Sequence, residues 1–168
     1  MDELIDYSED LLRSEFQKLP DGTWELEALM DQDPGSDSRD PLAARMTLTV
    51  DGDRMTMDFS SSDPPAKGAM NSVEAVTVSS AVVTMKMIFP SIPMNQGVFR
   101  AIDFVLPPGL LLSAEFPDPV SGCAAGVYPA VVDLVLKGLI DLIPGRCMAG
   151  ATGLLNIVMG GEDPREGR

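Results

Sequence analysis

The sequence predicts an α+β fold, in which an antiparallel meander of strands packs with two buried apolar helices. Apolar and polar residues alternate along residues 23–59, an almost unbroken apolar segment follows at 73–89, and helical periodicity recurs at 127–143. The chain has 168 residues, of which 45% are hydrophobic, so it can form one domain with a substantial core and is not disordered.

Residues 2–19 predict an amphipathic helix at the start of the chain. Leucines and Phe16 recur on one helical face, and the acidic residues near the beginning suit the positive end of the helix dipole. Pro20-Asp21-Gly22 then ends this helix.

The alternation of apolar and polar residues that begins at Thr23 predicts a three-stranded meander with one solvent-exposed face. A polar loop over residues 31–41 separates the first two strands, and Asp51-Gly52 is a strong hairpin turn between the second and the third. The strands are expected over residues 23–28, 46–50 and 55–59.

Residues 60–72 predict an irregular turn, because two prolines and Gly68 exclude regular structure. Asn71, followed three residues later by Glu74, is typical of a capping box for a helix over 73–89. Loss of such a cap on replacing Asn71 by alanine should cost about 1 kcal/mol. The helix is apolar on nearly every side, so we expect it to be buried.

The last part of the chain predicts an irregular segment over 91–100, in which Asn95 and Gly97 suit a turn with positive φ. Asp133 and Lys137 are spaced to form an ion pair on the amphipathic helix. Two short strands, that helix and an extended segment are expected over residues 102–106, 110–114, 127–143 and 148–159.

Composition disfavours several classes of partner. The net charge of −14 repels phosphate backbones and anionic lipid surfaces, so we expect neither nucleic acid nor membrane binding. Lys86 and Lys137 interrupt the best apolar segments, and the N-terminus lacks the features of a signal peptide. A cytoplasmic protein with reduced Cys123 and Cys147 is therefore expected.

The residues themselves leave the catalytic groups unknown. Histidine is absent, which removes the commonest general base and the commonest metal ligand, and no glycine-rich segment has the lysine of a phosphate loop. Asp58 could hold a divalent cation together with Asp63 only with ligands from elsewhere, and no metal site is predicted. The candidates for substrate binding are Asp63, Asn71 and Asn95, each of which can also be a purely structural turn or cap residue.

Five motifs follow one another along the chain: LPDGTWELEALMD, LTVDGDRMTMDFSSSDPPAKGAMN, IPMNQGVFRAIDFVLPPGLLL, YPAVVDLVLKGL and NIVMGGEDPREGR. In this order they resemble the hydantoinase B/oxoprolinase family, which includes B-type subunits of ATP-dependent hydantoinases and 5-oxoprolinase and related subunits of acetone and acetophenone carboxylases. The resemblance covers essentially the whole chain, and its most specific parts are residues 20–23, 50–71 and 95–109.

The resemblance implies that residues 1–168 form a single domain corresponding to the central portion of a larger mixed α/β subunit, as a fragment or a split piece. The abrupt acidic start and the polar ending GGEDPREGR favour the same expectation. In the family, metal-binding histidine and aspartate motifs precede this region and a glycine-rich region follows it. Neither is found in this chain, so we expect it to be inactive alone.

The resemblance further implies a component of an ATP-dependent cyclic-amide hydrolase or a related ketone carboxylase. The expected partners are a hydantoinase A-like subunit that uses ATP and the remaining part of the B-type subunit, in a hetero-oligomer. ATP and a divalent metal are expected on the partner chains, and no cofactor is expected on this chain alone. The alternative is a non-catalytic structural or assembly subunit of such a complex.

Overall fold

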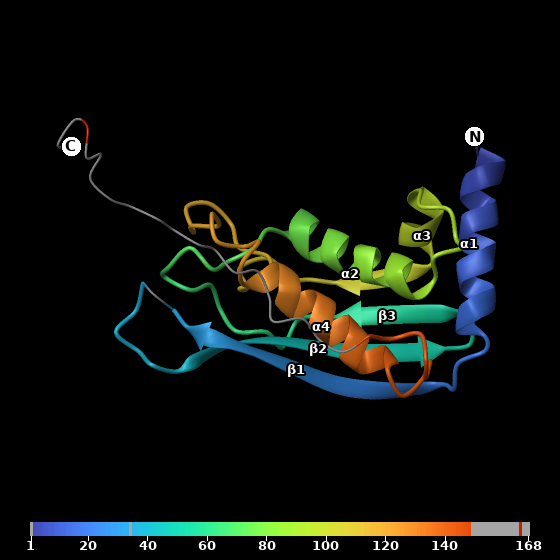
Figure 1. The fold of residues 1–168 in the computed structure, drawn as a ribbon, viewed down its shortest axis with the longest axis horizontal. Helices are drawn as coiled ribbons and strands as arrows, with labels where there is room; N and C mark the ends of the chain where they lie inside the picture. Colours follow the sequence, from blue (N-terminus) through green and yellow to red (C-terminus); the bar gives the residue numbers. More distant parts are fainter. Residues whose placement is uncertain (1, 34, 149–164, 166–168) are drawn as a thin grey trace.

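The computed structural model describes residues 2–33, 35–148 and 165, and it confirms the α+β class. A four-stranded sheet carries two helices on one face and a third helix across one end (Figure 1). The strands are β1 (Gly22–Gln32), β2 (Pro41–Asp51), β3 (Arg54–Asp58) and β4 (Ile102–Val105), and the helices are α1 (Asp2–Phe16), α2 (Glu74–Ile88), α3 (Gln96–Arg100) and α4 (Val127–Leu139).

The predicted meander is present, and β4 extends it. β1, β2 and β3 are antiparallel neighbours in that order, and β4 pairs with β3 in the parallel sense. The β2–β3 turn contains Gly52 at a φ of 60°, a conformation that glycine adopts without strain. The parallel pair needs a long crossover, which residues 59–101 supply with α2 and α3.

The second short strand, predicted over residues 110–114, is wrong. The segment forms a turn instead, and Leu111 and Leu112 are fully buried in the core. The Leu112 carbonyl accepts a hydrogen bond of 2.6 Å from the Thr77 hydroxyl of α2, so its partner is a side chain rather than a neighbouring strand. Burial, and not strand pairing, explains this apolar run.

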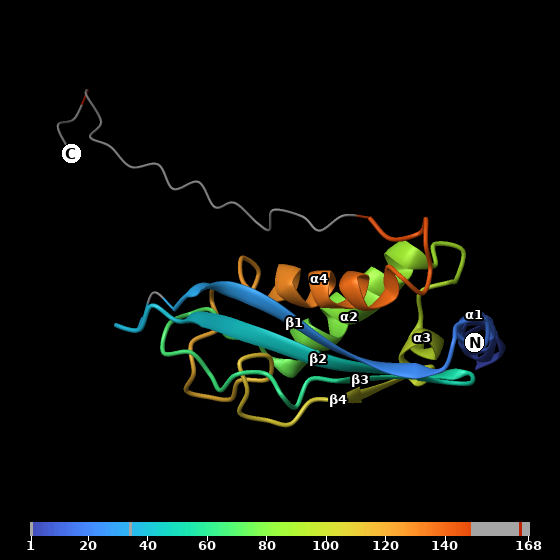
Figure 2. The same ribbon diagram turned by 90° about the horizontal axis from the view of Figure 1, so that it is seen from below.

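The core lies between the sheet and the helices α2 and α4. α4 packs across β1 and β2, and α2 lies beside α4 over the same face, as Figures 1 and 2 show. The alternation of each strand sends its apolar side chains toward these helices and leaves polar side chains on the opposite face. Large side chains that are fully buried in this core include Met46, Leu48, Met55, Met57, Met85, Ile88 and Leu134.

The helix α2 is buried on one side only. Its inner side carries the hydroxyls of Thr77, Ser80 and Thr84, all fully buried and all bonded to backbone carbonyls. Its outer side exposes Val83 and Met87. The sequence of this helix is apolar on nearly every side because apolar side chains also lie on its exposed outer side. Its buried inner side is partly polar.

Two sequence predictions around the helix ends are wrong. The N-cap of α2 is Val73, without a side-chain cap bond, so Asn71 is not the cap. Lys137 donates to the Glu27 carbonyl at 3.1 Å and makes no ion pair with Asp133. For Lys137, a backbone carbonyl of a distant segment replaces the local partner that the spacing suggests.

Residues 91–100 are also more regular than predicted, since they contain α3. Asn95 is its N-cap and accepts from the Gly97 amide at 2.8 Å, and neither residue has a positive φ. Gly97 is required for a different reason: a Cβ there would lie 2.1 Å from the Ile5 carbonyl oxygen. The glycine thus lets α3 pack closely on α1.

The helix α1 lies across the end of the sheet, where the β2–β3 turn and α3 meet it (Figure 1). Arg13 donates to the carbonyls of Asp53 and Arg100, at 3.3 and 3.0 Å, and so joins these elements. None of the described helices is long and apolar enough to cross a membrane. The extended segment predicted over 148–159 lies outside the described residues, apart from Met148.

Candidate functional site

Two irregular segments, residues 59–72 and 106–126, lie against each other and form what we call the loop junction (Figure 1). Backbone bonds join them: the Ser72 amide donates to the Leu111 carbonyl, and the Ala114 amide donates to the Ser72 carbonyl, both at 2.8 Å. Two of the candidate residues, Asp63 and Asn71, lie in this junction.

Asp63 is held by β2 through both of its carboxylate oxygens. One oxygen accepts from the Ala43 amide at 2.8 Å, and the other accepts from the Arg45 guanidinium at 2.7 Å. Arg45 also pairs with Glu27 at 2.8 Å, and these hydrogen bonds, first to Asp63 and then to Glu27, raise the pKa of Arg45. The carboxylate of Asp63 therefore anchors the loop to the sheet.

The Ser60–Ser62 run has one inward residue, Ser62. Its hydroxyl accepts from the Arg45 amide and donates to the Arg45 carbonyl, both at 2.9 Å. The side chain thereby satisfies the β2 backbone beyond the end of β3, while Ser60 and Ser61 are exposed. This supports the interpretation of the run as a structural turn.

Asn71 is completely buried and bonds to the backbone of both segments of the loop junction. Its carbonyl oxygen accepts from the Ala66 amide at 2.6 Å, and its amide nitrogen donates to the carbonyls of Ala66, Gly68 and Pro119 at 2.9, 3.2 and 3.0 Å. The side chain is thus the hub of the loop junction.

Asn95 lies at the other end of the molecule, on α3. Besides capping that helix, it donates to the Leu4 carbonyl and to the Ser8 hydroxyl of α1. The helix α2 separates the two asparagines, and its 15 residues span about 22 Å. The structure therefore brings Asp63 and Asn71 into one junction and leaves Asn95 apart.

Sequence reasoning missed Asp33, whose carboxylate accepts from the amides of Gly35 and Gly68, each at 2.9 Å. Burial by itself would raise the pKa of Asp33, but the backbone hydrogen bonds from Gly35, Gly68 and Lys67 together hold it below its usual value. The spacing of Asp33 and Gly35 marks a turn, but no local signal reveals the bond to Gly68, which is 35 residues away.

An open hollow of about 450 Å³ lies on the uncovered side of the sheet, beside the loop junction, and we call it the Arg45 groove. Its polar lining residues are Glu25, Glu27, Arg45, Thr47 and Ser61. Pairing β1 with β2 places Glu27 opposite Arg45, so this polarity could have been found from the alternation once the register was known. The groove can hydrogen-bond a small polar molecule, although the Arg45 charge is already matched by two carboxylates.

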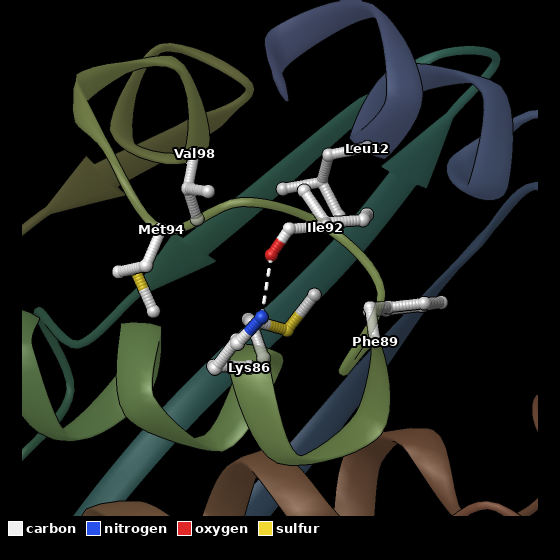
Figure 3. Close-up of a pocket in the computed structure, with 7 residues that line it drawn as sticks. Leu12, Lys86, Phe89, Ile92, Met94 and Val98 are labelled. Atoms are coloured by element: carbon white, nitrogen blue, oxygen red, sulfur yellow. Dashed lines mark hydrogen bonds between the residues drawn. The ribbon is translucent and has the colours of Figure 1, made fainter. Parts of the chain in front are cut away.

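A second cavity, shown in Figure 3, lies between α1, α2 and α3 and is too small for a substrate. Its volume is about 10 Å³, which is room for about one water molecule. Lys86 crosses it and donates to the Ile92 carbonyl at 2.6 Å (Figure 3). This lysine thus serves as the hydrogen-bond donor for backbone carbonyls of the segment that follows α2.

Metal ligands do not gather among the described residues, where no group of three carboxylate or cysteine side chains could hold an ion. Asp58 accepts from the Ser60 amide at 2.8 Å, and Asp63 is engaged as described above. Every buried side-chain nitrogen and oxygen in the described part of the chain has a hydrogen-bond partner. The arrangement of polar side chains in the described residues suits a supporting or binding surface. These residues do not show a general acid and a general base placed together for catalysis.

The family model described as Hydantoinase B/oxoprolinase matches residues 1–168. A protein of Pseudomonas sp. (strain NS671), provisionally named as the B-type component of a D-/L-hydantoinase, is 29% identical over 173 residues, which cover 96% of this chain and 29% of that protein. The 5-oxoprolinase of Dictyostelium discoideum is 27% identical over 121 residues, covering 70% of this chain and 9% of its own.

Solved structures show the same fold in larger proteins. The ATP-dependent caprolactamase from Pseudomonas jessenii superposes with a TM-score of 0.72 at 24% identity, over 86% of this chain and 25% of that chain. Acetone carboxylase in its nucleotide-free structure gives 0.71 at 16% identity, over 83% and 20%. The chain thus spans less than a third of the length of each of these relatives.

Proposed function

The chain belongs to the hydantoinase B/oxoprolinase family, and from this we propose that it is a component of an ATP-dependent cyclic-amide hydrolase or of a related ketone carboxylase. It acts with an A-type subunit that uses ATP and with the remaining regions of a B-type subunit. The match of the family model to the whole chain is the observation that carries the proposal. The names of the hydantoinase, oxoprolinase and acetone carboxylase relatives support this general kind of reaction.

In the proposed complex this chain is a support for the reaction site rather than the source of its reactive groups. The absence of histidine from the sequence and the engagement of the buried polar groups with one another support this role. ATP and a divalent metal are held by the partner chains. The cytoplasmic location and the substrate-binding role of Asp63, Asn71 and Asn95 stay predictions.

The proposal is tested by reconstitution with an A-type subunit and a polypeptide carrying the remaining B-type regions. We expect ATP hydrolysis coupled to turnover of 5-oxoproline, a hydantoin or acetone only when all three polypeptides are present. Turnover by this chain alone, or undiminished turnover without it, would contradict the proposal.

The same assay tests a substrate contact at the Arg45 groove. Asp63→Asn should raise KM if Asp63 orients substrate through Arg45. Asp103→Asn is the matched control, because Asp103 pairs with Arg54 at the same 2.7 Å on a more exposed part of the sheet. Equal KM values for the two variants would assign Asp63 a structural role only.

A second candidate function is assembly without catalysis, favoured by the satisfied polar groups of the loop junction. In that case the other polypeptides would turn over substrate when supplied with a different stabilising contact or at high concentration. This chain would then change their dissociation constant and leave kcat unchanged.

A further inference from the structure

Within the loop junction, residues 115–118 form a turn that we call the Phe116 tip, because it exposes the aromatic ring of Phe116. Phe116 is 100% exposed, the largest exposed fraction among the large hydrophobic residues described. Exposed aromatic rings at a rigid position are typical anchors of protein interfaces. We propose that the Phe116 tip docks the chain on another polypeptide, into an apolar pocket rimmed by lysine or arginine.

The tip is held from both sides, so the ring is presented in a defined place. The Asp118 amide donates to the Glu115 carbonyl at 2.8 Å and closes the turn. On one side the Ala114 amide is bonded to Ser72, and on the other the Pro119 carbonyl accepts from the buried Asn71 at 3.0 Å. Binding through a held loop loses little conformational entropy, which favours docking.

A shallow hollow beside the tip provides further apolar contact. Its volume is about 500 Å³, and its apolar lining includes Val73, Leu106, Pro108 and Ala114. Val73 is 38% exposed although it stands at the start of a core helix. An incoming surface can therefore cover both the ring and the floor of this hollow.

The charges around the tip decide which kind of partner fits. Glu74 and Glu115 line the hollow, and Asp118 belongs to the tip itself. None of these three carboxylates makes an ion pair with a described lysine or arginine. A basic rim complements them, whereas a second copy, with its own net charge of −14, would bring acid against acid.

The inference rests on the proposed function in one respect, the choice of occupant. The relatives hold this segment within chains more than three times as long, so in them the segment is accompanied by the rest of a larger polypeptide. We therefore assign the tip to the remaining regions of the B-type subunit, and the A-type subunit and a second copy become alternative outcomes.

The test measures binding of this chain to a polypeptide that carries the remaining B-type regions, by isothermal titration calorimetry. Phe116→Ala should weaken binding at least about tenfold, as expected for an interface anchor. Tyr7→Ala is the matched control, since Tyr7 is also an exposed aromatic residue, 54% exposed, on α1 at the other end of the molecule. Unchanged melting temperatures show that both variants are folded.

Charge and fluorescence provide independent readouts. Glu115→Lys combined with Asp118→Lys should weaken binding and reduce its dependence on salt. Phe116→Trp should give an emission that shifts to shorter wavelength when the partner covers the tip, with the parent chain as the reference for Trp24. Equal affinity of Phe116→Ala and the parent, or no wavelength shift in a formed complex, would overturn the inference.

The two proposals fail in different ways. If the complex forms and turns over substrate but ignores Phe116, the docking inference is wrong and the proposed function stands. If no complex forms with the B-type polypeptide, both are wrong. A loss of self-association, or of binding to the A-type subunit alone, in Phe116→Ala would assign the tip to a different occupant and contradict the inference.

Discussion

Two asparagine side chains organise opposite ends of this molecule, and they differ in what surrounds them. Asn71 is fully buried in the loop junction and bonds only to backbone groups. Asn95 is half-buried beside α1 and α3, where it caps one helix and tethers the other. The Asn71 side chain supplies hydrogen bonds to backbone groups that have no helix or strand partner. The Asn95 side chain connects two helices that make their own backbone hydrogen bonds.

The difference shows where the chain depends most on a single side chain. Helices satisfy most of their own backbone groups. When the side-chain amide of Asn95 is removed, α3 therefore loses only its N-cap and its hydrogen bonds to α1. The loop junction lacks the repeating hydrogen bonds of a helix or a strand. Its buried backbone groups therefore depend on bonds between its two segments and on side-chain partners such as Asn71. The loop junction is also the region that carries the Phe116 tip and borders the Arg45 groove.

The largest effect is expected from Asn71→Ala. Its removal leaves the Ala66 amide and the carbonyls of Ala66 and Pro119 without partners, so we expect the free energy of unfolding to fall by about 4 kcal/mol. This value replaces the smaller one predicted for a helix cap. Urea unfolding followed by circular dichroism measures it, and a loss near 1 kcal/mol would remove the contrast between the two ends.

Asn95→Ala should have the next largest effect, about 2 kcal/mol, from a lost N-cap and a lost tether to α1. Asn95→Asp is the control, because aspartate can still accept from the Gly97 amide but cannot donate to the Leu4 carbonyl. It should recover the capping part only. A loss in Asn95→Ala that equals or exceeds that of Asn71→Ala would reverse the comparison.

Asp33→Asn sharpens the comparison through pH, with an expected loss of about 1 kcal/mol at neutral pH from weakened hydrogen bonds to Gly35 and Gly68. The pKa of Asp33 is lower in the folded chain than its unfolded value of about 3.9. Its contribution is therefore present above the unfolded pKa and is lost as the pH falls through the folded pKa.

The free energies of unfolding of the parent and of Asp33→Asn should accordingly converge as the pH is lowered below about 4. Urea unfolding at a series of pH values measures this. Asp37→Asn, the same substitution at an exposed aspartate of the same connection, is measured alongside as the control. A difference between parent and Asp33→Asn that grows on acidification would contradict the assignment.

The smallest effect is expected from Arg45→Met, about 0.5 kcal/mol, because partly exposed ion pairs contribute little. Arg54→Met is the matched control on β3, with one exposed partner, Asp103. Both losses should shrink in high salt. A loss above about 2 kcal/mol for Arg45→Met would show that the Arg45–Asp63 pair, and not Asn71, holds the junction together.

Much of the fold could be predicted because periodicity is local. The meander, α1, α2 and α4 were expected within a few residues of where they lie, since each needs only its own pattern of apolar side chains. β1 and β2 extend beyond the predicted strands, up to Gln32 and back to Pro41, because pairing across the hairpin continues where alternation stops. A strand over residues 102–106 was expected, and β4 lies there. Its parallel pairing with β3 could not be predicted, because a strand of four residues carries no pattern that selects its neighbour.

Less of the candidate site could be predicted. Asp63 and Asn71 were singled out as polar residues near a turn, but the partners that give them roles lie in other segments, at Arg45 and Pro119. Asp33 had the local signal of a turn with Gly35, but none for its bond to Gly68. Hydrogen-bond partners distant in the chain depend on how loops approach one another, which residue types and spacing do not specify.

By itself the sequence determined the acidic surface, the lack of imidazole groups, the sheet and its main helices, because each follows from composition or short-range periodicity. The tertiary structure decided which polar side chains become hubs and which apolar ones stay uncovered. Asn71 and Phe116 are both loop residues in the sequence, yet one is wholly buried and the other wholly exposed. The physical reason is that burial is a property of the packed chain, set by which segments meet in space.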